Sequence, residues 1–269
     1  MLGKLIKYEF RCSVRIFAIL LPAFLAYTAI YRGIIELLVR SMGSSENGSA
    51  ILAMIMGGMT FLFIILLAGL VAFNFIYIIY RFYKNMVTDE GYLMHTLPVS
   101  PWEHVTAKLI IAALQYIATI ITIVLSVLII IVGLLDQSVI DEIKYILDSA
   151  TGSIYVDGSQ LLNDVLDLLS AVISVTANIL VAYASIAIGQ LKNNNRALWS
   201  IGAYILVNIT LSIVSSSVSI LLTSSMSETT SPALIMNLST GISTLFNLVV
   251  AAAAFVCTCK IFSKNLNLR

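Results

Sequence analysis

Charged residues are scarce in this chain. Asp, Glu, Lys and Arg together make up 11% of its 269 residues, about half the fraction found in soluble domains. Hydrophobic residues make up 59%. A globule of this length needs a polar surface to stay dissolved, so the composition excludes a water-soluble fold. The net charge of +1 gives no reason to expect a nucleic-acid partner.

Motifs for nucleotide binding, hydrolysis and metal binding are also missing. The sequence contains no G-x-x-x-x-G-K-[ST] loop for nucleotide phosphates, no H-E-x-x-H and no G-x-S-x-G. His95 and His104 lack the spacing of a metal site, and no histidine or third cysteine lies near Cys257 and Cys259. We therefore expect no enzymatic activity, no metal and no cofactor in this chain.

Long apolar blocks dominate what is present. They cover residues 16–38, 51–80, 105–135, 166–191, 197–223 and 236–262. Each block is long enough to cross about 30 Å of hydrocarbon as a helix. The first block is too long for a signal peptide and lacks a small-x-small cleavage site, so we interpret it as a retained helix. The sequence predicts an all-α membrane protein, residues 1–269 forming one transmembrane domain with about six transmembrane helices.

The basic residues predict an orientation for this domain. Twelve of the 15 lysines and arginines fall in the termini and in the segments 81–108 and 192–196, while Arg32, Arg40 and Lys144 fall on the other side. This bias places both termini in the cytoplasm. The segment 136–165 is acidic and would lie outside, where a short amphipathic stretch and turn signals predict an external cap.

Residues 1–15 have the pattern of an amphipathic helix at the inner membrane interface. Lys4, Lys7, Arg11 and Arg15 share one helical face, where they would meet anionic headgroups of the membrane lipid. Glu9 falls on the opposite, apolar face, where an unpaired carboxylate is costly. It either reaches the headgroup layer or pairs with a cation of a neighbouring cytoplasmic segment.

The cytoplasmic segment 81–104 carries two helix-start signals. Thr88 is a good N-cap before the acidic residues Asp89 and Glu90, and predicts a short helix that ends near Thr96, before Leu97-Pro98. Ser100-Pro101-Trp102-Glu103 then restarts a helix that leads into the third span. We expect Thr88, Asp89, Glu90, Gly91, Tyr92, Leu93 and Met94 to present a docking surface to the cytoplasm. An ordinary well-capped loop is the alternative.

Five stretches of the sequence resemble bacterial ABC-2 type transporter permeases. They are Leu5-Ile6-Lys7-Tyr8-Glu9-Phe10, Phe82-Tyr83-Lys84-Asn85, Asp89-Glu90-Gly91-Tyr92-Leu93, Thr96-Leu97-Pro98-Val99-Ser100 and Lys108-Leu109-Ile110. The resemblance implies a multi-pass permease of the bacterial plasma membrane that works in an exporter of two permeases, identical or paralogous, and two ATPase subunits. The short loop helix would be its coupling helix, docked on a separate ATPase that binds ATP and Mg. One departure is that the largest external segment follows the third span, whereas the family often places external helices between the last two.

Five spans each contain one amide side chain and no ionisable group near the middle. The amides are Asn74, Gln115, Asn178, Asn208 and Asn247. They either form hydrogen bonds between helices or line a chamber for an amphipathic cargo such as a peptide or antibiotic. Ion-coupled transport generally needs charged residues within the membrane, so their absence from the middle of these spans argues against an ion-coupled transporter. The resemblance therefore favours an ATP-driven exporter, and the alternative is a membrane transporter or scaffold that is not coupled to an ATPase.

Overall fold

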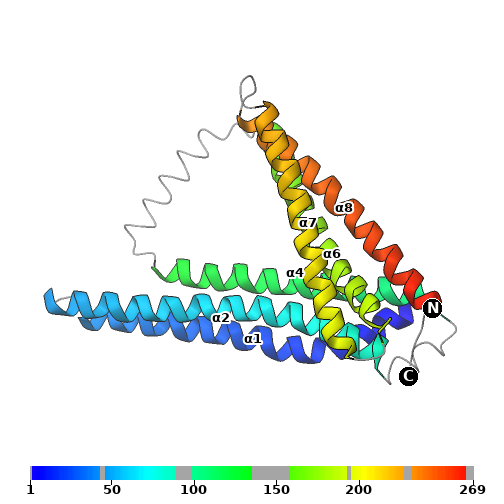
Figure 1. Cartoon of the computed structure of the whole chain (residues 1–269). Helices are drawn as coiled ribbons and strands as arrows, with labels where there is room; N and C mark the ends of the chain where they lie inside the picture. Colours follow the sequence, from blue (N-terminus) through cyan, green and yellow to red (C-terminus); the bar gives the residue numbers. More distant parts are fainter. Residues whose placement is uncertain are drawn as a thin grey trace. The chain divides into compact units, whose positions relative to one another are not determined.

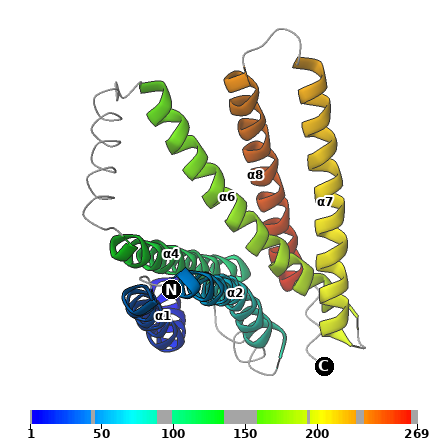
Figure 2. The same cartoon turned by 90° about the vertical axis from the view of Figure 1, so that its left-hand side faces the viewer.

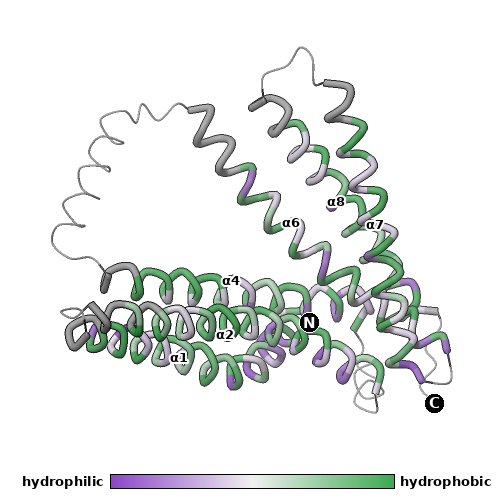
Figure 3. Tube along the Cα trace, turned by 60° about the vertical axis from the view of Figure 1, so that its left-hand side comes forward, coloured by the Kyte–Doolittle hydropathy of each residue, from purple (hydrophilic) through white to green (hydrophobic). Residues whose placement is uncertain are grey.

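A computed structural model describes residues 2–42, 46–88, 99–134, 158–192, 195–226 and 232–264. Across these ranges the chain is helical. The helices are α1 (Leu2–Met42), α2 (Glu46–Val87), α4 (Pro101–Leu134), α6 (Gly158–Gly189), α7 (Arg196–Met226) and α8 (Pro232–Lys264) (Figure 1). All of these are long and apolar enough to cross a membrane, and hydrophobic residues run along most of their length (Figure 3). The described chain therefore has the architecture of a multi-pass membrane protein.

Several helices extend beyond the predicted spans; α2, for example, runs from Glu46 to Val87, where the sequence predicted a span over 51–80. The predicted interfacial helix 1–15 and the first span form one continuous helix, α1, which has no break near residue 15 and continues through Pro22. At 41 residues α1 is about 60 Å long at 1.5 Å per residue, which exceeds the thickness of the hydrocarbon core. Similarly, α6 begins at Gly158, so the last residues of the predicted external cap 136–165 belong to a helix. The remainder of that cap lies outside the described residues.

Two compact units make up the chain. The N-terminal unit comprises Lys7–Tyr77 and Ala113–Tyr155, and the C-terminal unit comprises Met1–Ile6, Ile78–Ala112 and Val156–Arg269. The boundary crosses α1 after Ile6, α2 after Tyr77 and α4 after Ala112. The ends of α2 and α4 that flank residues 88–100 therefore belong to the same unit as α6, α7 and α8.

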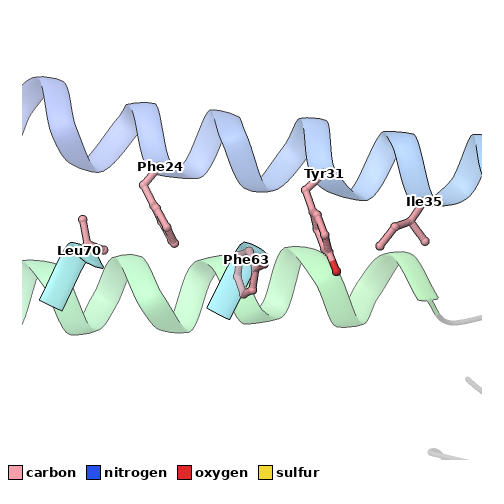
Figure 4. Packing of buried hydrophobic residues seen from close by; sticks show 5 residues of the cluster. All are labelled: Phe24, Tyr31, Ile35, Phe63 and Leu70. Atoms are coloured by element: carbon pink, nitrogen blue, oxygen red, sulfur yellow. The ribbon is translucent and has the colours of Figure 1, made fainter. Parts of the chain in front are cut away.

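The N-terminal unit is held together by large apolar side chains between α1, α2 and α4, which run side by side (Figures 1 and 2). Phe24, Tyr31 and Ile35 of α1 point toward Phe63 and Leu70 of α2 (Figure 4). The rings of Tyr31 and Phe63 stack with centroids 5.3 Å apart. Since lipid is as apolar as these side chains, close packing and not exclusion from water holds these helices together.

The C-terminal unit is centred on α6. This helix packs against both α7 and α8, which contact each other much less. In the most apolar stretch of α6, 56% of the residues are buried, whereas in the corresponding stretch of α7 only 6% are buried. Alanines at 177, 182, 184 and 187 are all buried and let the neighbouring helices approach.

The end of α6 lies very close to the start of α7. A Cβ added to Gly189 would lie 2.8 Å from the backbone nitrogen of Ser200 and 2.9 Å from its Cα, so only glycine fits there. Asn195, just before α7, has a φ of 53°, a left-handed conformation that asparagine tolerates better than most residues. The close approach of Gly189 and Ser200 keeps α6 and α7 in contact at one end.

Candidate functional site

The start of α4 confirms the second predicted helix cap. The backbone N–H of Ser100 donates to the Glu103 carboxylate at 3.2 Å, and the Ser100 hydroxyl donates to the same oxygen at 3.1 Å. Pro101 is the first helical residue. The helix that follows residues 88–100 therefore begins where the sequence predicts it.

The predicted docking helix cannot be described in the same way. Asp89, Glu90, Gly91, Tyr92, Leu93 and Met94 lie outside the described residues. Thr88 is described, and its hydroxyl donates to the carbonyl oxygen of Lys84. This bond closes the last turn of α2, so the role of Thr88 as an N-cap for a following helix stays a prediction.

The loop is anchored by an aromatic cluster at the end of α2. Phe82 is 1% exposed, and its ring stacks on Tyr183 of α6 with centroids 3.7 Å apart. Phe262 of α8 meets the same ring edge-on at 6.0 Å. One turn further along α2, the carbonyl oxygen of Met86 accepts a hydrogen bond from Nε2 of Gln190 at 3.3 Å. These contacts fix the root of the loop to α6 and α8.

A cavity of about 360 Å³ lies between α6, α7 and α8. Three of the five predicted amides line it, one from each helix: Asn178, Asn208 and Asn247. The remaining lining residues are Ser174, Ala177, Val181, Leu211, Ser212, Ser215, Ser216, Phe246 and Val250. No charged side chain is among them. The cavity has the size of a small-molecule site, and its polar groups are all neutral.

Hydrogen bonds orient two of the three cavity amides. Nδ2 of Asn208 donates to the carbonyl oxygen of Tyr204 at 2.9 Å, which leaves Oδ1 of Asn208 as an acceptor. The Tyr204 hydroxyl donates to Oδ1 of Asn178 at 3.4 Å, which leaves Nδ2 of Asn178 as a donor. The cavity thus offers both donors and acceptors to an uncharged polar group.

The other two predicted amides lie in a packed cluster in the N-terminal unit. Nδ2 of Asn74 on α2 donates to the Thr119 hydroxyl on α4 at 2.9 Å, and that hydroxyl donates to the carbonyl oxygen of Gln115 at 2.9 Å. Asn74, Thr119 and Gln115 are only 0%, 2% and 7% exposed. Asn74 therefore fits the interhelical hydrogen-bond interpretation. The side-chain amide of Gln115 does not show such a bond, because only its backbone carbonyl takes part and its Nε2 has no hydrogen-bond partner in the described structure.

The N-terminal cations and Glu9 occupy different surroundings. Lys4, Lys7, Arg11 and Arg15 are all exposed, as a cationic face requires. Glu9 is 2% exposed and has an interaction partner. Its burial argues against the reading in which Glu9 reaches the headgroup layer. The position of this face at a membrane surface stays a prediction.

Two features of the site were missed by sequence reasoning. The aromatic cluster was one, because Tyr183 and Phe262 lie in uniformly apolar stretches and only packing brings them to Phe82. The serines of α7 were the other. Ser212, Ser215 and Ser216 recur at helical spacing within an apolar span, and that pattern could have indicated a polar face.

Comparisons with known proteins give no relative: no protein-family model, no curated protein and no solved structure matches the chain.

Proposed function

We propose that this chain is the permease subunit of an ATP-driven exporter, similar to the ABC-2 type, which moves an amphipathic cargo such as a peptide. ATP and Mg would be bound by a separate ATPase subunit that docks on residues 88–94. A second permease, identical or paralogous, would complete the membrane part, in the plasma membrane of a bacterium.

One observation carries this proposal: the root of the loop is fixed to the helices that line the cavity. Phe82 stacks on Tyr183, and Tyr183 lies five residues from Asn178 on α6. A displacement of the loop would therefore be passed to α6 and α8 by direct side-chain contact. A transporter driven by a separate ATPase needs such a connection, whereas a scaffold does not.

The proposal includes cytoplasmic termini, supported by the distribution of basic residues. Cysteines introduced at Ser45, Asp157 and Ser227 should react with an impermeant thiol reagent added outside intact cells. Cysteines at Asn85 and Asn194 should not. External labelling of Asn194→Cys would exclude the proposed orientation.

The decisive experiment is purification of the tagged chain from its native cells. We expect a Walker-A ATPase to co-purify, the complex to hydrolyse ATP, and the chain alone to be inactive.

Tyr92→Ala and Leu93→Ala should each weaken the assembly by about 1–3 kcal/mol, since buried tyrosine and apolar anchors dominate such interfaces. Tyr80→Ala, which removes an exposed tyrosine of α2 outside the loop, is the matched control. Normal assembly of both loop variants would exclude this loop as the coupling element.

A further inference from the structure

The polar residues of α6, α7 and α8 are distributed unequally along the helices. We call the ends at Gly158, Met226 and Pro232 the distal end, and the ends at Gly189, Arg196 and Lys264 the turn end (Figure 2). Asn178 and Asn208 lie at the middle of their apolar segments, and Asn247 lies within about one helical turn of it. The three amides therefore mark a level half-way along the unit.

Between this level and the distal end the helices are rich in hydroxyl groups. Within the apolar segments Leu166–Gly189, Arg196–Leu221 and Leu238–Ser263 these residues are Ser170, Ser174 and Thr176 on α6, Thr210, Ser212, Ser215, Ser216, Ser217 and Ser219 on α7, and Ser239, Thr240, Ser243 and Thr244 on α8. Between the same level and the turn end the serines and threonines are few: Ser185 on α6, Ser200 on α7, and Thr258 and Ser263 on α8. The polarity of the unit thus changes at the cavity.

Three of the four serines that line the cavity differ from their neighbours; the fourth, Ser216, donates its hydroxyl to the carbonyl oxygen of Ser212 at 2.6 Å. Ser217 and Ser219 lie outside the cavity lining, and their hydroxyls donate to carbonyl oxygens of their own helix at 2.7 and 3.0 Å. Within the described part of the chain, the hydroxyls of Ser174, Ser212 and Ser215 have no hydrogen-bond partner. Hydroxyls that cannot bond in hydrocarbon are costly, so these groups require water or a polar ligand.

The side chain of Asn247 also requires water or a polar ligand. Within the described residues it has no hydrogen-bond partner, although it lies deep in its apolar segment. Next to it the cavity offers the free donor of Asn178 and the free acceptor of Asn208. A group with one N–H and one C=O, such as an amide, matches this set better than an ion, which would find no countercharge among the lining residues.

We propose that the cavity is the inner end of a water-accessible half-channel that opens at the distal end and binds the uncharged amide groups of an amphipathic molecule. The turn-end half of the unit, with its buried alanines and apolar side chains, closes the other side. That this molecule is the exported cargo, released through the distal half, rests on the proposed function. The half-channel itself does not depend on an ATPase.

Water access can be tested by cysteine labelling in a background with Cys12→Ser, Cys257→Ser and Cys259→Ser. Single cysteines replace Ser174, Ser212 or Ser215, and the controls replace Leu206 and Leu245, which are 66% and 65% exposed and lie outside the cavity. A cationic methanethiosulfonate is added to intact cells, and Ser227→Cys shows whether the distal end faces the reagent. The three cavity cysteines should react at least about tenfold faster than the controls, because only a thiol in water ionises to the reactive thiolate. Equal rates at cavity and control positions would overturn the half-channel.

Ligand chemistry is tested on the same variants, purified without any ATPase. N-octanoylglycinamide, an uncharged amide amphiphile, should slow labelling of Ser212→Cys at least about twofold, and octanoate, its charged counterpart, should not. Asn247→Leu should raise the amide concentration needed for half-maximal protection by about threefold to thirtyfold, in the range of one or two hydrogen bonds within a membrane. Val249→Leu, at an exposed position two residues further on, should leave it unchanged. Failure of the amide to protect, or equal protection by octanoate, would overturn the amide site. A missing partner ATPase would overturn only the exporter proposal.

Discussion

The two groups of midmembrane amides are made of similar residues but are held differently. In the N-terminal unit, Asn74 and Gln115 are almost fully buried and Asn74 donates to Thr119 on the facing helix. In the C-terminal unit, Asn178, Asn208 and Asn247 line an open cavity, because α7 and α8 each pack on α6 and barely on each other. An amide at the middle of a span is therefore not a site by itself. The packing of its neighbours decides whether it joins helices or meets a ligand.

The largest expected difference between the two groups comes from adding a charge. Asn74→Asp places a carboxylate at a position that is 0% exposed, so we expect the protein to lose about 2.5–3.5 kcal/mol of stability. Asn247→Asp places the same carboxylate at the cavity, where water can solvate it, so the loss should be clearly smaller. The measurement is unfolding of both variants in mixed micelles at neutral pH. Equal losses would show that the cavity is as dry as the packed cluster.

An intermediate effect on stability is expected at the turn end of the helices, where α6 contacts α7. Gly189→Ala forces a methyl group onto the Ser200 backbone and should destabilise the protein by about 1–3 kcal/mol. Gly202→Ala on α7 is the matched control, since a Cβ there meets no atom within 4 Å. That control should be neutral or stabilise the helix by up to about 1 kcal/mol. Melting temperatures of the two variants separate a packing clash from a general effect of alanine. If both variants melt alike, the close approach of α6 and α7 is not required.

Features that depend on neighbouring residues could be predicted from the sequence, whereas features that depend on helix packing could not. Six helices were predictable because length and hydropathy are local properties, and the Ser100–Glu103 cap was predictable because its partners are three residues apart. The amides were found as candidates from their residue type. Their division into a packed pair and a cavity was not predictable, since it depends on how α6, α7 and α8 are arranged. The stacking of Phe82 on Tyr183 was missed for the same reason, because the two residues are far apart in the chain.

The smallest expected effect tests the hydrogen bond of the packed cluster directly. Asn74→Leu and Thr119→Val each remove one partner of the 2.9 Å bond between α2 and α4. A double-mutant cycle with these two changes should give a coupling free energy of about 0.6 kcal/mol, the average for such bonds in a membrane protein. Each single substitution should lower the free energy of unfolding by little more than this coupling free energy. Asn74→Leu also removes Oδ1, which has no hydrogen-bond partner in the described structure.

The matched cycle in the cavity uses Asn178→Leu and Asn247→Leu. No hydrogen bond joins these two side chains, so their effects on stability should add without coupling. Both cycles are read from unfolding free energies in the same micelles, so that solvent and detergent effects cancel. Coupling in the cavity and none in the packed cluster would reverse the assignment of the two groups. Coupling in both would mean that the cavity closes in solution and that its amides bond to each other when no ligand is bound.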